Sequence, residues 1–199
     1  GDYGLPGDLT LTQNAVSEFV DWKNNTNAIG RIQFLESNQE TYSAYGGYWL
    51  TLAESYYQNG DYQKCLGAIA AYEDLGTRIF RKDYDLAIIL PLVITAAEEI
   101  KTTNDYIPFA EQYAQAILNN TEHSNWSLRY VAAQTYIGLY GKTKDPKYLE
   151  IAYNITLDNA NYLVGEQLQA NASYLSPIIL KDTNNLTSKQ KQEAEQYNK

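Results

Sequence analysis

Apolar residues recur every three or four positions along most of the chain, and no useful length of sequence alternates between apolar and polar residues. Such spacing gathers apolar side chains on one face of a helix, whereas a strand needs alternation. The first ten residues, with three glycines and a proline, are typical of a loop. Helices are predicted at 12–22, 28–37, 41–58, 62–75, 84–101, 105–118, 125–140 and from 146 to beyond 162, with a weaker one after 187.

Short polar turns separate these predicted helices. At the turn "QNGDYQ", Gly60 suits a left-handed cap that ends one helix, and Asp61 is a predicted N-cap of the next. Asp83 and Ser124 are predicted N-caps in the same way, and Pro146 fits the first turn of its helix. The pattern therefore predicts an all-α domain of antiparallel helical hairpins.

The predicted helix at 84–101 is the most apolar part of the chain and contains Pro91. A proline inside a helix removes one hydrogen bond, so we expect either a kink there or a true helix start nearer Leu90. The apolar run at 86–95 is too short to span a bilayer.

Three of the predicted turns are similar to one another: "NGDYQKCLGAI", "TNDYIPFAEQYA" and "KDPKYLEIAYNI". A tyrosine near the start of the second helix recurs at Tyr62, Tyr106 and Tyr148, with spacings of 44 and 42 positions. Self-similarity at this scale is typical of helical solenoids, in which each hairpin buries its apolar face against its neighbours.

The first of these hairpins, residues 46–79, resembles the tetratricopeptide repeat. That family's pattern has a large aromatic residue, then Leu and a small residue, then Tyr, then Gly-x-Tyr at the turn, then another small residue. Two degenerate units follow, and together the three cover about 46–165, with a period longer than the family's usual one of about 34. The matching positions of the first unit are Trp49, Leu52, Ala53, Tyr56, Gly60, Tyr62 and Cys65.

The resemblance implies a right-handed α–α superhelix: one domain over 1–199, with N-terminal helices at 11–45, three hairpins at 46–165 and a polar tail at 171–199. It also implies a groove lined by the first helix of each hairpin. The groove lacks the basic clamp with which some family members hold a carboxylate, so it suits a basic or neutral partner. The groove positions implied are Leu50, Glu54, Tyr57, Ile94, Glu98, Tyr130 and Gln134.

The composition narrows the classes of partner. The net charge is −9 and the pI about 4.6, which argues against nucleic acid and against an anionic membrane surface. Tyrosine is unusually frequent, with 19 residues against 4 Phe and 3 Trp. Tyrosine packs between helices and also suits recognition of protein or sugar.

Few residues carry catalytic or metal chemistry. His123 is the only histidine and Cys65 the only cysteine, so no disulfide within the chain and no ordinary His- or Cys-based metal site is expected. We interpret His123 as a surface loop residue and Cys65 as a packed thiol. Acidic pairs such as Glu98-Glu99 keep open an alternative, a fragment of an α-toroid carbohydrate-active enzyme, since glycosidases use paired carboxylates.

These observations favour a non-catalytic scaffold that binds a protein or peptide and needs no cofactor. Two alternatives stay open: a glycan-binding domain of a surface lipoprotein and the enzyme fragment. The composition favours a bacterial origin. Because the chain starts with Gly1-Asp2, we expect a preceding segment, such as an export signal or a membrane anchor, in a larger protein.

Overall fold

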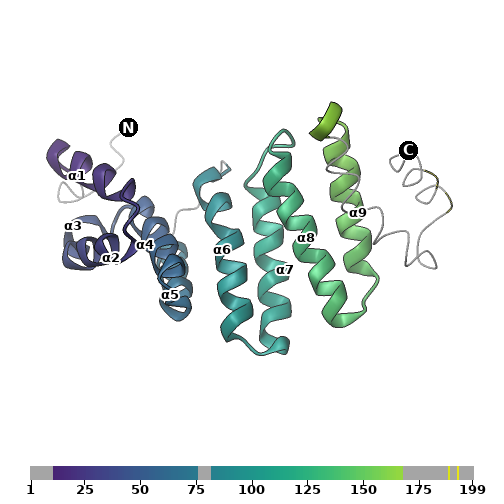
Figure 1. Cartoon of the computed structure of the whole chain (residues 1–199), viewed down its shortest axis with the longest axis horizontal. Helices are drawn as coiled ribbons and strands as arrows, with labels where there is room; N and C mark the ends of the chain where they lie inside the picture. Colours follow the sequence, from purple (N-terminus) through teal and green to yellow (C-terminus); the bar gives the residue numbers. More distant parts are fainter. Residues whose placement is uncertain (1–10, 76–81, 168–187, 189–191, 193–199) are drawn as a thin grey trace, which may run out of the picture. The chain divides into compact units, whose positions relative to one another are not determined.

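The computed structural model describes residues 11–75, 82–167, 188 and 192, and these residues form α-helices and connecting turns without a β-strand (Figure 1). The first ten residues, and the helix and tail predicted toward the C-terminus, lie outside or almost wholly outside that part. The helices are α1 (Gln13–Lys23), α2 (Ala28–Ser37), α3 (Gln39–Tyr42), α4 (Gly46–Gln58), α5 (Tyr62–Asp74), α6 (Tyr84–Ile100), α7 (Thr103–Asn119), α8 (Trp126–Thr143) and α9 (Lys147–Ala160).

The all-α prediction is confirmed, and most helix bounds differ from the predicted ones by only a few residues. The exception is the predicted helix at 41–58, which is divided into α3 and α4 because Tyr45 is extended, with φ −100° and ψ 119°. The indole of Trp49 donates to the Ser43 carbonyl at 2.8 Å. That hydrogen bond occupies a carbonyl that an unbroken helix would have used internally.

The predicted helix ends have mixed outcomes. Asp83 does cap α6, because its Oδ1 accepts from the Leu86 amide at 3.0 Å. Asp61 makes no side-chain cap; its carboxylate accepts from the Asn59 side chain at 2.8 Å instead. The residue before α8 is Asn125 and not Ser124, so that prediction was wrong by one position. The alternative start of α6 near Leu90 was also wrong, since the helix begins at Tyr84.

The chain forms two compact units, whose boundary falls within α6. The first contains the described residues 11–75 together with 95–100, and the second contains 82–94 and the described residues from 101 onward. Within the first unit α4 packs against α2 and α5, and within the second α8 packs between α7 and α9. The prediction of one repeat domain stays a prediction.

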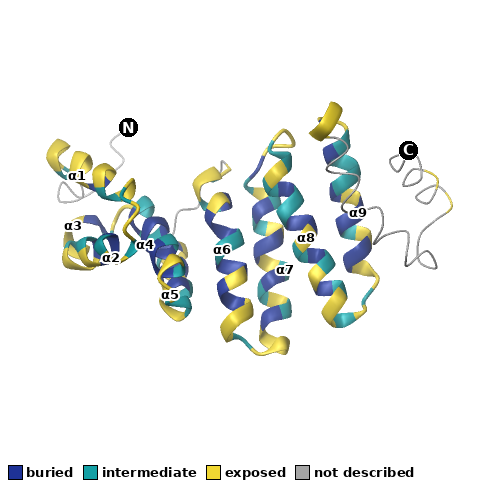
Figure 2. Cartoon of the chain, in the orientation of Figure 1, coloured by how far each residue is buried: buried dark blue, intermediate teal, exposed yellow. Residues whose placement is uncertain are grey.

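Each unit has its own buried core, visible as the dark faces of the helices in Figure 2. The only thiol belongs to the first core: Cys65 is fully buried, and burial raises its pKa to about 11. Fully buried side chains of the first unit include Leu35, Tyr42, Tyr48, Leu52 and Ile69, and those of the second include Leu90, Val93, Ile117, Tyr136 and Leu139.

The same three-residue contact ties helices together in each unit. In the first, the Tyr56 hydroxyl donates to Glu36 Oε1 at 2.8 Å, and Lys64 Nζ donates to the same oxygen at 3.0 Å. The Lys64 ammonium also lies 5.1 Å from the centre of the Tyr56 ring. The Tyr56 hydroxyl and the Lys64 ammonium lower the pKa of Glu36. This Tyr–Glu–Lys tie joins α2, α4 and α5.

The second unit repeats this chemistry with different helices. The Tyr148 hydroxyl donates to Glu111 Oε2 at 2.8 Å, and Lys147 Nζ donates to Glu111 Oε1 at 3.3 Å. Lys147 lies 4.5 Å from the centre of the Tyr148 ring. This second Tyr–Glu–Lys tie joins α7 to α9. In both units, therefore, the hydrogen bonds of one glutamate connect neighbouring helices.

The turn between α4 and α5 allows a first prediction. Gly60 has φ +79°, the left-handed cap expected from the sequence, and a Cβ there would meet no atom within 4 Å. Gly60→Ala should therefore lower the free energy of unfolding by about 1–2 kcal/mol through backbone strain alone. Urea denaturation followed by circular dichroism measures the loss.

Gly67 provides a matched control for this substitution. It lies inside α5, where a Cβ also has open space but the backbone is helical. Gly67→Ala should stabilise the chain by about 0.5–1 kcal/mol, because alanine is the better helix former. Equal effects of the two substitutions would show that the Gly60 turn is not strained by a side chain.

Candidate ligand-binding surfaces

The groove positions predicted in the first unit lie on α4, the helix at the centre of that unit. Leu50 is buried and contributes to packing, whereas Glu54 and Tyr57 are half-buried. The Tyr57 ring lies 5.8 Å from that of Tyr62, across the turn to α5. Only Glu54 and Tyr57 of this set could therefore touch a partner directly.

Glu54 already has a charged neighbour. Arg31 is buried on α2, and its Nη1 lies 3.8 Å from Glu54 Oε2. Arg31 also donates to the Lys23 carbonyl at 3.3 Å and to the side chain of Gln58. Because Arg31 balances the Glu54 carboxylate, the attraction of this part of α4 for a basic partner is smaller than the sequence alone suggests.

The remaining predicted groove positions lie on α6 and α8. Ile94 is buried, while Glu98 is exposed. On α8, the Gln134 amide donates to the Tyr130 hydroxyl at 3.1 Å, so these two side chains do form a common polar surface. That all the predicted positions line one groove stays a prediction.

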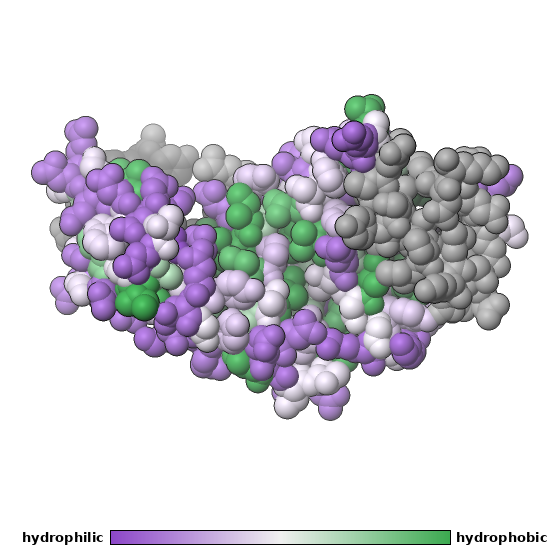
Figure 3. Space-filling view, in the orientation of Figure 1, coloured by the Kyte–Doolittle hydropathy of each residue, from purple (hydrophilic) through white to green (hydrophobic). Residues whose placement is uncertain are grey.

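An apolar stripe that the sequence reading did not single out lies on α6 within the second unit. Tyr84 is 48% exposed and Ile88 44% exposed, one helical turn apart, while Ala87 and Leu90 on the same helix are fully buried. Figure 3 shows hydrophobic surface over this helix and its neighbours, bordered by hydrophilic side chains. We call these two side chains, Tyr84 and Ile88, the α6 stripe.

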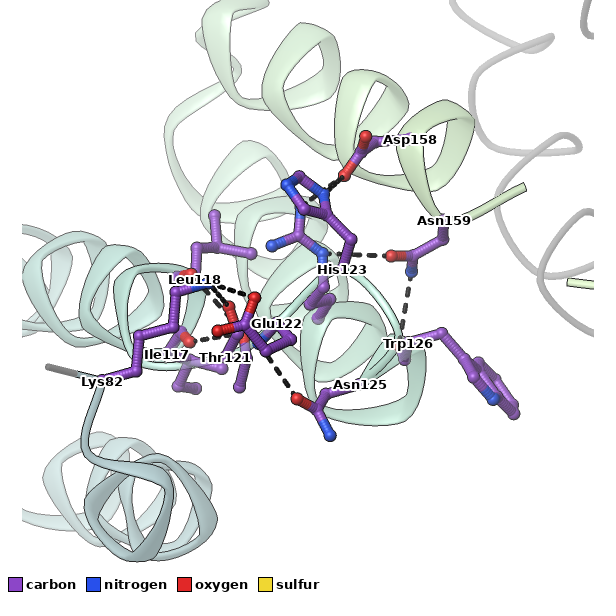
Figure 4. Close-up of polar contacts among 11 residues, drawn as sticks. Lys82, Ile117, Leu118, Thr121, Glu122, His123, Asn125, Trp126, Asp158 and Asn159 are labelled. Atoms are coloured by element: carbon purple, nitrogen blue, oxygen red, sulfur yellow. Dashed lines mark hydrogen bonds and ion pairs between the residues drawn. The ribbon is translucent and has the colours of Figure 1, made fainter. Parts of the chain in front are cut away.

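A polar cluster brings His123 together with residues of α8 and α9 (Figure 4). His123 Nδ1 lies 2.6 Å from Asp158 Oδ2, and Arg129 Nη2 donates to that same oxygen at 2.6 Å. Arg129 Nε donates to Asn159 Oδ1 at 3.3 Å, and the Asn159 amide donates to the Trp126 carbonyl at 3.3 Å. Arg129 and Asn159 are buried, so packing restricts the movement of their side chains.

An aromatic side chain completes what we call the His123 cluster: His123, Arg129, Asp158, Asn159 and Tyr162. The Tyr162 ring stacks on the imidazole, with the ring centres 5.4 Å apart and the planes 22° from parallel. Tyr162 is 54% exposed and the His123 side chain 52% exposed. Both rings are therefore accessible from solvent, beside a buried guanidinium.

The loop that carries His123 is fastened to the start of α6. Lys82 Nζ donates to the Thr121 carbonyl at 2.8 Å and pairs with Glu122 at 2.8 Å. The hydrogen bond from Lys82 lowers the pKa of Glu122. The Asp83 amide donates to Asn120 Oδ1 at 2.9 Å. The loop that carries the imidazole joins α7 to α8, and these contacts fix it to the start of α6.

The hydrogen bond to Asp158 bears on which nitrogen of the His123 imidazole carries the proton. An ionised carboxylate only accepts, so Asp158 fixes the proton of a neutral imidazole on Nδ1 and leaves Nε2 as an acceptor. A hydrolase with this orientation would need a nucleophile beside Nε2. Among the described residues, no hydroxyl or thiol is hydrogen-bonded to that nitrogen.

Sequence reasoning placed His123 in a surface loop, and it is indeed exposed, but its partners were missed. Asp158 is 35 positions away and Arg129 lies in the middle of a helix pattern. No local motif connects these residues, so only the packing of α9 on α8 could show their meeting. Within the described part of the chain, no group of three or more His, Cys, Asp or Glu side chains is arranged to hold a metal ion.

The chain was compared with known families, curated sequences and solved structures. No family model, no curated protein sequence and no solved structure matches this chain. Among the described helices, none combines the length and the apolar character needed to cross a membrane.

Proposed function

We propose that the chain is a non-catalytic helical scaffold that binds a protein or peptide. The observation that carries the proposal is the α6 stripe, because Tyr84 and Ile88 are nearly half exposed on a helix whose Ala87 and Leu90 are fully buried. Large apolar side chains that are neighbours on a surface mark interaction sites more often than scattered ones do. An amphipathic or extended peptide with spaced apolar residues is the partner that fits such a stripe.

The hydrogen bonds of three carboxylates support binding over sugar hydrolysis at their positions. Glycosidases need two carboxylates that face one substrate. In this chain Glu36 and Glu111 are occupied by the two Tyr–Glu–Lys ties, and Asp158 accepts from Arg129 and His123. Acids used in this way stabilise contacts between helices and are poor candidates for general acid and base.

The wider context of the proposal comes from the sequence. The tetratricopeptide-like pattern at 46–79 and its two weaker echoes suggest a right-handed superhelix, and helices that pack against their sequence neighbours are compatible with it. We further propose a bacterial, exported or membrane-anchored protein of which this chain is one module. The partner expected is basic or neutral, since the net charge is −9.

A peptide-display selection tests the proposal. The immobilised chain should enrich linear peptides with spaced aromatic or aliphatic residues, and a synthetic version should bind in solution with a dissociation constant of roughly 1–100 μM. Ile88→Gln should weaken that binding by about tenfold or more, because it puts an amide where the peptide's apolar side chains pack. Isothermal titration calorimetry measures both affinities.

Val20→Gln is the matched control for this experiment. Val20 lies on α1 in the first unit. Its side chain is 45% exposed, close to the 44% of Ile88. The Val20→Gln variant should bind the peptide with the same affinity as the unchanged chain. Failure to enrich any peptide that binds in solution, or equal binding by Ile88→Gln, would refute the proposal.

A second candidate function, glycan binding, is favoured by a different surface. Tyr162 is the most exposed aromatic ring among the described residues, and it lies beside charged and imidazole groups held in place by hydrogen bonds. Aromatic rings flanked by fixed polar groups are typical of ligand-binding sites.

A further inference from the structure

The His123 cluster has three polar atoms that its own contacts leave unused. Both donors of the cluster reach Asp158 through Oδ2, which leaves Oδ1 as a spare acceptor. Arg129 uses Nε and Nη2, which leaves the two protons of Nη1 as spare donors. His123 uses Nδ1, which leaves Nε2. Among the described residues, no further hydrogen bond engages these atoms.

Their mixture of donors and acceptors limits the kind of ligand. A hydroxyl group donates one hydrogen bond and accepts others, so a hydroxyl can donate to Asp158 Oδ1 while it accepts from Arg129 Nη1. Each protein group is held by a hydrogen bond of its own, so little side-chain freedom is lost when a ligand binds.

The charges argue against an ionic ligand. Arg129 and Asp158 are joined at 2.6 Å and cancel one another. An anion would meet the Asp158 carboxylate, whose side chain is 32% exposed, whereas the Arg129 side chain is only 10% exposed. A cation would be repelled by the Arg129 guanidinium directly behind that carboxylate. A neutral ligand with hydroxyl groups avoids both costs.

The aromatic surface specifies the rest of the ligand. Tyr162 stacks on His123 on one side, and its exposure of 54% leaves the remainder of the ring open. An aromatic ring binds the C–H face of a flat, partly apolar molecule while polar neighbours bind its edge. A pyranose ring has such a C–H face, and it carries adjacent hydroxyls at its edge.

We infer that the His123 cluster binds a neutral sugar, with its hydroxyls held by Asp158 and Arg129 and the sugar ring against Tyr162. The inference rests on the second candidate function, glycan binding. It is independent of peptide binding through the α6 stripe, so either could fail alone. The site uses one exposed ring, so the affinity for a single sugar chain should be roughly millimolar.

The test uses His123 as its own reporter. Because the chain has one histidine, the imidazole gives a single set of C–H signals in a carbon–proton correlation NMR spectrum. The full chain is titrated with maltohexaose, cellohexaose, mannohexaose and xylohexaose, each to about 20 mM, well above the expected dissociation constant. At least one should shift the His123 signals along a saturating curve.

Substitutions separate this site from non-specific contact. Tyr162→Ala should weaken the binding by about tenfold or more, while Tyr162→Phe should keep it, because only the ring is required. Tyr45→Ala removes a tyrosine of the first unit that is 47% exposed and should leave the sugar affinity unchanged. All three replace exposed side chains, and a thermal melt confirms that each variant is folded.

Two results would overturn the inference. One is the absence of any saturating shift of the His123 signals with the four oligosaccharides. The other is a sugar affinity that Tyr162→Ala leaves unchanged. A chain that binds the display-selected peptide but none of the sugars would retain the scaffold function and lose the glycan site.

Discussion

Tyr136→Ala should lower the free energy of unfolding by about 3–5 kcal/mol, the range for truncation of a large buried aromatic side chain. Tyr136 is 1% exposed on α8, and its ring stacks on that of Tyr148 at 6.1 Å. The substitution leaves a cavity between α8 and α9 and removes the ring against which Tyr148 packs. Urea denaturation followed by circular dichroism measures the change.

Tyr162→Ala is the control, since it deletes the same side chain at an exposed position. A surface substitution of this kind should change the free energy of unfolding by about 0.5 kcal/mol or less. If the two substitutions destabilised the chain equally, Tyr136 would not be central to the core of the second unit.

Raising the pH from about 9 to about 12 should unfold the chain cooperatively, because buried tyrosines resist ionisation. Burial raises the pKa of Tyr48 to about 12 and that of Tyr136 to about 12. Burial, with help from the hydrogen bond to Glu36, also raises the pKa of Tyr56, and burial raises those of Tyr42 and Tyr148.

The direction follows from proton binding. Between pH 10 and 12 the unfolded chain, whose tyrosines titrate near 10, has lost phenolic protons that the folded chain still holds. The stabilisation is therefore complete below pH 10 and is lost as the pH rises through 12. A shift of two pKa units corresponds to about 2.7 kcal/mol for each tyrosine, so a few such residues exceed the usual stability of a domain.

Absorbance of phenolate at 295 nm and circular dichroism at 222 nm, recorded together against pH, measure this transition. The phenolate absorbance of the buried tyrosines should rise together with the loss of helix. Tyr48→Phe should move the unfolding midpoint to higher pH, provided that it folds at neutral pH. Smooth titration of every tyrosine near pH 10 with the helices intact would contradict the prediction.

The helices could be predicted because their signals are local. The bounds of α2 and the left-handed Gly60 both follow from residues within one or two turns. The division of the predicted helix at 41–58 was missed, since it depends on packing. A Cβ at Gly46 would lie 2.9 Å from the Tyr72 ring of α5, so the start of α4 is set by a neighbour distant in sequence.

The candidate surfaces were harder to predict, for the same physical reason. The resemblance to the tetratricopeptide repeat supplied the groove positions. It could not show that Leu50 and Ile94 are buried or that Arg31 balances the charge of Glu54. The His123 cluster draws on residues from a loop and two helices. A single sequence carries no mark of such a meeting, because each residue taken alone fits an ordinary loop or helix face.

The sealed thiol of Cys65 bears on how the protein would withstand an oxidising environment. Peroxides and related oxidants attack thiolates and thioethers first. The chain has no methionine, and its one sulfur atom is fully buried, with a thiol pKa of about 11. In the folded state, sulfur oxidation therefore has no accessible target, and this route of chemical damage opens only when the first unit unfolds.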